Sequence, residues 1–140
     1  MQNSKITLSM HIMQNDDHST TSYDADAIFT EKDGKFSLVF DEQNYDDEEI
    51  TGCRIEISDD SLRMRRNGPI VVEQTHIKGQ MTDGYIKTPF GRVYTKLRTD
   101  RYSFIQQADG VYHLELAYDL YTAEERTGTY LLEITITKKE

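Results

Sequence analysis

The stretch that decides the fold is residues 113–121, HLELAYDLY. Bulky apolar side chains stand at every second position of this stretch, and most of the side chains between them are polar or charged. Side chains alternate between the two faces of a β-strand, so this spacing places Leu114, Leu116 and Tyr118 on one face. A helix would mix the two sets. The stretch therefore predicts a strand with one buried face and one face in water.

The same alternation recurs along most of the chain. It predicts further strands within residues 6–12, 36–40, 53–57 and 130–136. Turn signals rich in Gly, Asn, Asp and Pro separate the strands at short intervals, as at Asp33-Gly34 and Asp109-Gly110. This spacing predicts about ten strands, joined mostly by hairpins.

A chain of about ten hairpin-joined strands is expected to close on itself. An open sheet of that size would leave exposed edges, and consecutive hairpins favour a meander that curls. We therefore predict an all-β fold, a single up-and-down β-barrel of antiparallel strands that spans residues 1–140 as one domain. A two-sheet sandwich is the alternative, but it usually needs longer crossing connections than we find here.

Composition limits the classes of partner. The chain has 140 residues, 36% of them apolar, which is enough for one buried core. It has no run of eighteen apolar residues, and residues 1–5 do not resemble a signal peptide, so we expect a soluble, cytoplasmic protein with no membrane partner. The net charge of −9 disfavours binding to nucleic acid.

The charge is unevenly distributed. Residues 1–60 carry 15 acidic and 4 basic side chains, whereas residues 61–101 carry 9 basic and 3 acidic ones. Either the acidic loops of the first half face the basic strands of the middle, or the basic segment lines a mouth that accepts an anion.

We interpret the acidic run 46–49 as a solvated loop. A calcium site is its alternative, although the alternating ligands and turn glycine of a calcium loop are missing.

The hairpin around Asn67-Gly68 allows two registers. A two-residue turn would pair Arg66 with Pro69 and send the apolar residues of the two strands to opposite faces. A three-residue loop, residues 66–68 with Gly68 left-handed, pairs Met64 with Ile70 and gathers the apolar residues on one face. We predict the second register, in which Leu62 pairs with Val72, Arg66 lies in the loop at the rim and Gln74 points inward. In the next hairpin, Thr88-Pro89-Phe90-Gly91, we expect Phe90 to fold back over the core.

No motif for catalysis or for a cofactor is present. The chain has no Gly-rich phosphate loop, paired-cysteine metal motif or nucleophile elbow, so we predict no cofactor, no metal and no named catalytic residue. A hydrolase or isomerase that uses scattered Asp and Tyr groups is the least favoured alternative.

Cys53 is in phase with Ile55, which predicts a small buried hydrophobe. His76 is in inward phase, which predicts a hydrogen-bonded interior imidazole, with a ligand role as the alternative.

The stretch from Arg66 to Leu120 resembles the YwiB-like family, bacterial proteins with a domain of unknown function. The matching residues are Arg66-Asn67-Gly68, Gln74, Gly79, Thr82, Pro89-Phe90-Gly91, Thr99 and Ala117-Tyr118-Asp119-Leu120. The first 60 residues match only in strand pattern, and His76 stands where an aromatic residue is expected. The resemblance implies a lipocalin-like, or calycin-like, β-barrel in a cytoplasmic bacterial protein. It implies no reaction, cofactor or catalytic residue.

Gln74 is the inward polar group that bears most on function, because a buried amide must be hydrogen-bonded. Either it ties the barrel wall to Thr82 or Tyr118, or these residues and Thr99 form a polar cluster on a cavity wall. In the second case Arg66 at the mouth would receive an anionic group, such as a carboxylate. An open cavity with converging polar groups would favour this interpretation.

The leading functional hypothesis is non-covalent binding of a small, partly apolar or anionic ligand, with Arg66, Gln74, Thr82, Thr99 and Tyr118 as candidate binding residues. The alternative is a filled barrel that acts as a protein-interaction module through its charged rim or an exposed edge strand. A solid core with an apolar surface patch would favour the alternative. The sequence predicts neither the ligand nor the oligomeric state.

Overall fold

The structure is a computed structural model that describes residues 2–43 and 49–139. It has ten strands, as the spacing of the turns predicted, and its described residues form no helix. The strands are β1 (Gln2–Gln14), β2 (Asp17–Lys32), β3 (Lys35–Gln43), β4 (Ile50–Ile57), β5 (Ser61–Asn67), β6 (Val71–Ile77), β7 (Met81–Thr88), β8 (Gly91–Ala108), β9 (Val111–Thr122) and β10 (Glu125–Lys138). In the described part of the chain, no helix has the length and apolar character that crossing a membrane requires.

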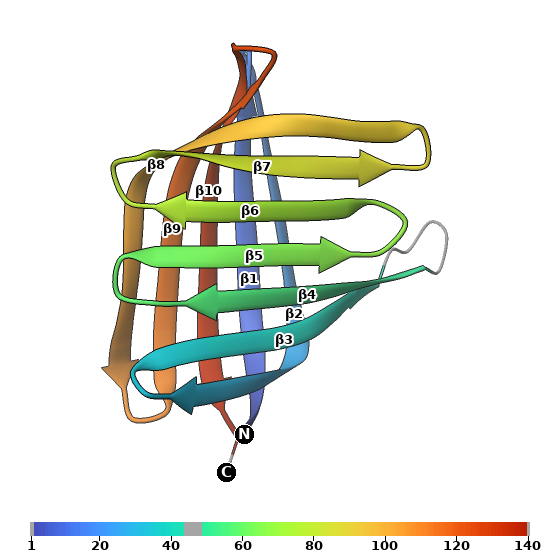
Figure 1. The fold of residues 1–140 in the computed structure, drawn as a ribbon. Helices are drawn as coiled ribbons and strands as arrows, with labels where there is room; N and C mark the ends of the chain where they lie inside the picture. The colour runs from blue at the N-terminus through green and yellow to red at the C-terminus, as the bar shows by residue number, and fades with distance from the viewer. Residues whose placement is uncertain (1, 44–48, 140) are drawn as a thin grey trace.

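The strands form a closed antiparallel barrel in chain order, so the predicted up-and-down barrel is confirmed. Each strand pairs with its neighbours in sequence, and β1 pairs with β10 to close the circle. Strands β3 to β7 cross β1, β2, β9 and β10 at a steep angle (Figure 1). Strand β8 belongs to both groups, because it pairs with β7 at residues 91–98 and with β9 at residues 95–108. A register shift between Thr99 and Arg101 interrupts this long strand, as a β-bulge does.

The barrel has an incomplete seam between β2 and β3. These strands pair over six residues each, from Ala27 opposite Phe40 to Lys32 opposite Lys35. Residues 17–26 of β2 pair with β1, and no described strand pairs with their other edge. Beyond Phe40, β3 pairs with β4 alone. The two strands therefore diverge and leave an opening in the barrel wall.

The core lies on the alternate positions that the sequence predicted. Leu114, Leu116 and Tyr118 are all buried, and so is Cys53 at 3% exposure, as predicted. Next to the β2–β3 and β8–β9 turns, aromatic rings gather in two stacked pairs, Phe29 with Phe36 and Phe104 with Tyr112. Ring centroids in these pairs lie 5.5 and 5.6 Å apart. This aromatic cluster fills one end of the barrel.

The predicted register of the β5–β6 hairpin is wrong. Met64 pairs with Gln74 rather than with Ile70, Leu62 pairs with His76 rather than with Val72, and residues 68–70 form the loop. Gly68 does not have the predicted positive φ. The shift lengthens the ladder up to Asn67 opposite Val71, and it keeps every side chain on its face because the displacement is an even number of residues. Arg66 consequently lies within β5, paired with Val72, and not in the loop.

The prediction for Phe90 is also wrong. Its side chain is 99% exposed. Thr88 pairs with Gly91, so Pro89 and Phe90 form a two-residue turn at the tip of the β7–β8 hairpin. That hairpin projects beyond the neighbouring strands at the right of Figure 1, which leaves no core within reach of its tip.

Candidate functional site

Three of the predicted site residues lie together around His76. The imidazole is fully buried, and its Nε2 lies 3.0 Å from Oε1 of Gln74 while its Nδ1 lies 2.9 Å from Oγ1 of Thr99. The amide oxygen can only accept, so Nε2 donates to it and Nδ1 accepts the hydroxyl proton of Thr99. Gln74 also hydrogen-bonds to the Tyr118 hydroxyl, and the Tyr118 ring lies 4.5 Å from the His76 ring. The prediction of a hydrogen-bonded interior imidazole is confirmed.

Burial determines the protonation of this network. It lowers the pKa of His76 to about 4, because a charged imidazole would lose its hydration. It also raises the pKa of Tyr118 well above the usual range, although the bond from Gln74 opposes the shift. The network is therefore neutral at physiological pH. Its members are hydrogen-bonded to one another, which is the wall tie expected between Gln74 and Tyr118.

Thr82 stands apart from this network. Its hydroxyl donates to the main-chain oxygen of Thr75 and lies 3.4 Å from that of Leu97. The β6–β7 ladder ends at Glu73 opposite Tyr85, so the contact with Thr75 links β6 and β7 beyond their last paired residues. Thr82 thus binds main chain and not Gln74.

Arg66 belongs to a second cluster on the inward faces of β2 to β5. Its guanidinium donates to Oε2 of Glu42 at 2.6 Å, and the thiol of Cys53 lies 3.0 Å from Oε1 of the same carboxylate. Burial, with Glu42 adding to it, raises the pKa of Cys53 to about 12. The same two causes raise the pKa of Tyr23 far above its usual range. Glu42 is therefore the centre around which Arg66, Cys53 and Tyr23 gather.

Two donors of this cluster are buried without a hydrogen-bond acceptor. They are the hydroxyl of Tyr23, which lies beside Glu42 without regular hydrogen-bond geometry, and the Nε of Arg66. Among the described residues, no other buried side-chain nitrogen or oxygen lacks a partner. Leaving such a group unpaired costs about 1–3 kcal/mol, which an incoming oxygen acceptor would recover.

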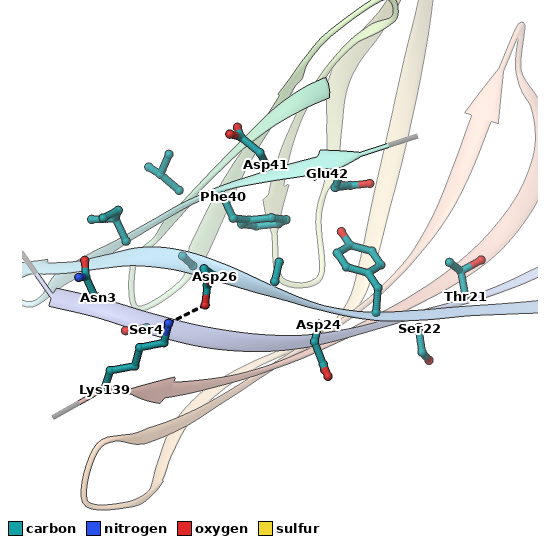
Figure 2. A pocket seen from close by; sticks show the side chains of 15 residues that line it. Asn3, Ser4, Thr21, Ser22, Asp24, Asp26, Phe40, Asp41, Glu42 and Lys139 are labelled. Carbon is teal, nitrogen blue, oxygen red and sulfur yellow. Dashed lines mark hydrogen bonds and ion pairs between the residues drawn. The ribbon is translucent and has the colours of Figure 1, made fainter. Parts of the chain in front are cut away.

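The cluster adjoins a cleft at the seam between β2 and β3. The cleft has a volume of about 960 Å³ and is lined by Tyr23, Glu42, Phe40 and the chain around Ala25. Figure 2 shows Phe40 projecting into the space between β3 and β2, whereas Asp41 projects away from it. The cleft is lined by none of the five predicted binding residues. It exists because β2 and β3 stop pairing at Ala27 and Phe40.

Sequence reasoning did not select Tyr23 or Glu42 as site residues. A signal for Glu42 was available, because it continues the inward alternation of Phe36, Leu38 and Phe40. A carboxylate in inward phase at the end of an apolar strand is a candidate for a paired or functional group. Tyr23 had no such signal, since its neighbourhood depends on where β2 leaves β3.

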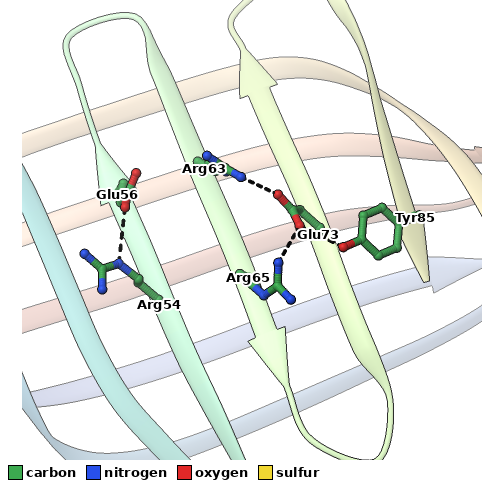
Figure 3. Close-up of polar contacts among 6 residues, drawn as sticks. All are labelled: Arg54, Glu56, Arg63, Arg65, Glu73 and Tyr85. Atoms are coloured by element: carbon green, nitrogen blue, oxygen red, sulfur yellow. Dashed lines mark hydrogen bonds and ion pairs between the residues drawn. The ribbon is translucent and has the colours of Figure 1, made fainter. Parts of the chain in front are cut away.

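Most of the basic middle segment is paired close by. Arg63 and Arg65 both contact Glu73, at 2.6 and 2.9 Å, and Tyr85 donates to the same carboxylate (Figure 3). Among the described ion pairs of residues 61–101, only Arg66 with Glu42 joins the basic segment to the acidic first half. The expected pairing between the halves is thus limited to the cleft cluster. Asp46, Asp47 and Glu48 of the acidic run lie outside the described residues.

Comparisons with known proteins agree with the fold. A family model described as "Domain of unknown function (DUF1934)" matches residues 6–134. The crystal structure of the ywiB protein from Bacillus subtilis is similar over 99% of this chain and 93% of that chain, with a TM-score of 0.86 and 16% sequence identity. At this identity the likeness shows the fold alone. No curated protein matches the chain. The resemblance drawn from residues 66–120 is confirmed, and the family match includes most of the first 60 residues.

Proposed function

Since the chain belongs to the DUF1934 family, whose description names no activity, we propose a function from the site itself. The β2–β3 cleft binds a small, partly apolar molecule reversibly, and Tyr23, which lines the cleft, donates to an oxygen acceptor of that molecule. The observation that carries the proposal is the unpartnered hydroxyl of Tyr23, a residue of the cleft wall beside Glu42. An acceptor oxygen on a molecule in the cleft would give this hydroxyl the regular hydrogen bond that it lacks.

The cleft fits this class of molecule. Its volume of about 960 Å³ falls at the upper end of the range of about 300–1,000 Å³ that is typical of ligand sites. Phe40, Ala25 and Ala27 give it apolar walls. A carboxylate ligand at Arg66 is less suitable than the sequence suggested, because Glu42 already neutralises the guanidinium. We therefore propose a neutral acceptor, such as a carbonyl or hydroxyl oxygen.

The acidic residues of the cleft support a neutral or cationic ligand as well. Asp24 and Asp26 are among its lining residues, and Asp26 is held by Lys139 at 2.6 Å. An anion would approach these carboxylates in a protein whose net charge is already −9.

The test begins with native mass spectrometry of protein purified from its own host, which identifies any retained small molecule. That molecule is then titrated by calorimetry into wild type, Tyr23→Phe and Ala25→Trp. Tyr23→Phe should weaken binding by about 0.5–1.5 kcal/mol, because one hydrogen bond is lost. Ala25→Trp should abolish binding by filling the cleft. Ala108→Trp, at an exposed position outside the cleft, is the matched control and should bind like wild type.

Stability measurements separate a binding role of Tyr23 from a structural one. If its hydroxyl is unpartnered, Tyr23→Phe should leave the free energy of unfolding unchanged or raise it by up to about 1 kcal/mol. A retained molecule that binds Ala25→Trp as tightly as wild type would refute the cleft as its site. The absence of any retained molecule would favour the second candidate.

The second candidate is a protein-interaction module, supported by the free edge of β2. Residues 17–26 present unpaired main-chain groups on that edge among the described strands, and such an edge can accept a strand from another protein. A partner bound in this way should shift the amide resonances of residues 17–26 in NMR spectra. A small molecule in the cleft should instead leave residues 17–20 unshifted and shift the amides of Phe40 and Glu42 on β3.

A further inference from the structure

Three side chains with metal-binding atoms meet on the outer face of β9 and β10. His113 and Glu115 are two residues apart on β9 and so share a face, and Glu133 of β10 is the cross-strand partner of Glu115. A ring nitrogen of His113 and one oxygen from each carboxylate all lie within 4.8 Å of one another. We propose that these three residues bind a divalent transition cation of the zinc class. None of them lines the β2–β3 cleft, so this site is separate from the proposed ligand site.

A cation between the two glutamates would reduce the repulsion between their carboxylates. Like charges directly opposite each other in an antiparallel pair are destabilising, and these side chains are only 24% and 37% exposed. Arg101 contacts Oε1 of Glu115 at 2.6 Å, and Nε2 of His11 lies 3.7 Å from Oε2 of Glu133. Each of these contacts uses one carboxylate oxygen, and the second oxygen of each glutamate takes part in neither ion pair.

His113 is already oriented in the manner of a metal ligand. Its Nδ1 lies 3.2 Å from Oγ1 of Thr135, its cross-strand neighbour on β10. Metal-binding histidines commonly use one ring nitrogen for such an orienting bond and the other for the metal. Here the arrangement leaves Nε2 for the cation.

The donor set selects the class of cation. One imidazole and two carboxylates suit Zn²⁺ and its transition-metal neighbours, whereas Mg²⁺ prefers six oxygen ligands. Ligand distances of about 2.0–2.2 Å place the donor atoms of a tetrahedral site about 3.4 Å apart. Rotation of the partly exposed glutamate side chains can bring the donor atoms, which now lie within 4.8 Å of one another, to this distance. Three protein ligands leave the fourth position to water.

The experiment is a calorimetric titration, in which ZnCl₂ is added to protein that has first been treated with a chelator. Wild type should bind one Zn²⁺ per chain. His113→Gln and Glu133→Gln should each weaken binding at least about tenfold, since even the loss of a residue that only supports a ligand costs about that much. The matched controls are His18→Gln, an exposed histidine outside the cluster, and Glu56→Gln, an exposed glutamate paired with Arg54. Both controls should bind like wild type.

Visible absorption of bound Co²⁺ gives an independent measure of the coordination. A site of four or five ligands should give bands stronger than those of aqueous Co²⁺, and His113→Gln should lose them. Millimolar Mg²⁺ should not displace Zn²⁺. The proposal is overturned if wild type shows no saturable Zn²⁺ binding. It is equally overturned if both ligand variants bind like wild type, or if His18→Gln weakens binding as much as His113→Gln.

Discussion

At the scale of single residues, His76 is the side chain whose chemistry the fold alters most. It lies in the middle of the barrel, bonded to Gln74 and Thr99, and it has no acidic side chain among these partners. A charged imidazole there would lose hydration without gaining a counter-ion. The histidine is therefore held neutral by its surroundings, which makes the stability of the barrel dependent on pH.

We predict that the barrel loses stability in mild acid through His76. Its folded pKa of about 4 is below the unfolded value of 6.5, so its contribution is complete above pH 6.5 and is lost as the pH falls toward 4. Between pH 7.5 and pH 5 this loss is about 2 kcal/mol. Denaturant unfolding of wild type and His76→Gln at both pH values measures it. Equal pH dependence in the two proteins would contradict the assignment, since all other titrating groups are shared.

A second residue-scale prediction concerns Gly68, whose importance comes from close packing and not from φ. A Cβ added there would lie 2.5 Å from Oγ1 of Thr51 and 3.2 Å from its Cα. Gly68→Ala should therefore lower the free energy of unfolding by about 1–3 kcal/mol, the cost of overpacking. In a Thr51→Ala background the cost should be smaller, because the nearest atom is gone. An equal cost in both backgrounds would show that Thr51 is not the obstacle.

At the scale of strands, Glu73 joins three of them, and the main-chain pairing at one of the two junctions, β6 with β7, is short. It lies on β6, accepts from Arg63 and Arg65 of β5, and accepts from the Tyr85 hydroxyl of β7 (Figure 3). The bond from Arg63 is the main reason that the pKa of Glu73 is lowered, and Tyr85 adds to it. Three pairs of residues form the whole β6–β7 ladder, so side chains contribute much of its order.

We predict that Glu73→Gln destabilises the protein by about 1 kcal/mol, the scale of a partly exposed charge network. Glu56→Gln on β4, which removes the partner of a single exposed arginine, should cost less. Chemical denaturation of both variants makes the comparison. If both substitutions cost the same, Glu73 does not link the strands in the way that its geometry indicates.

The strands could be predicted from the sequence because their faces alternate locally, as in Leu114 and Leu116. The register of β5 and β6 could not, since an even displacement leaves Met64 and Gln74 on the same face. The candidate site was only partly predictable. Gln74 and Tyr118 were recognisable as inward polar groups, but the neighbours of Tyr23 depend on where the closing strands part, which no local pattern reveals.

At the scale of the whole molecule, the seam between β2 and β3 is where the barrel wall opens. The 16-residue strand β2 is held by β3 over six residues only. In residues 27–29 both edges of β2 are paired, in residues 30–32 only the β3 edge is, and in residues 17–26 only the β1 edge is. The paired part and the open part of the seam thus both lie on β2.

We predict that hydrogen exchange distinguishes the two parts of β2. In residues 27–29 all amides should be protected, because each one faces a paired strand. In residues 17–26 every second amide, the set that faces away from β1, should exchange rapidly. Exchange followed by NMR resolves the individual amides. Uniform protection through residues 17–26 would mean that another segment covers this edge.

The pairing of β1 with β10 has a mechanical consequence. Ser4 lies opposite Lys138, so the start of β1 and the end of β10 lie side by side (Figure 1). A force that separates residues 3 and 139 would pull perpendicular to this ladder and break its hydrogen bonds one pair after another, like a zipper. We expect low resistance in single-molecule pulling between those positions, and a high rupture force would contradict it. When the force is applied between residues 3 and 60 instead, the same barrel should resist more strongly, because several strands would have to slide past one another at once.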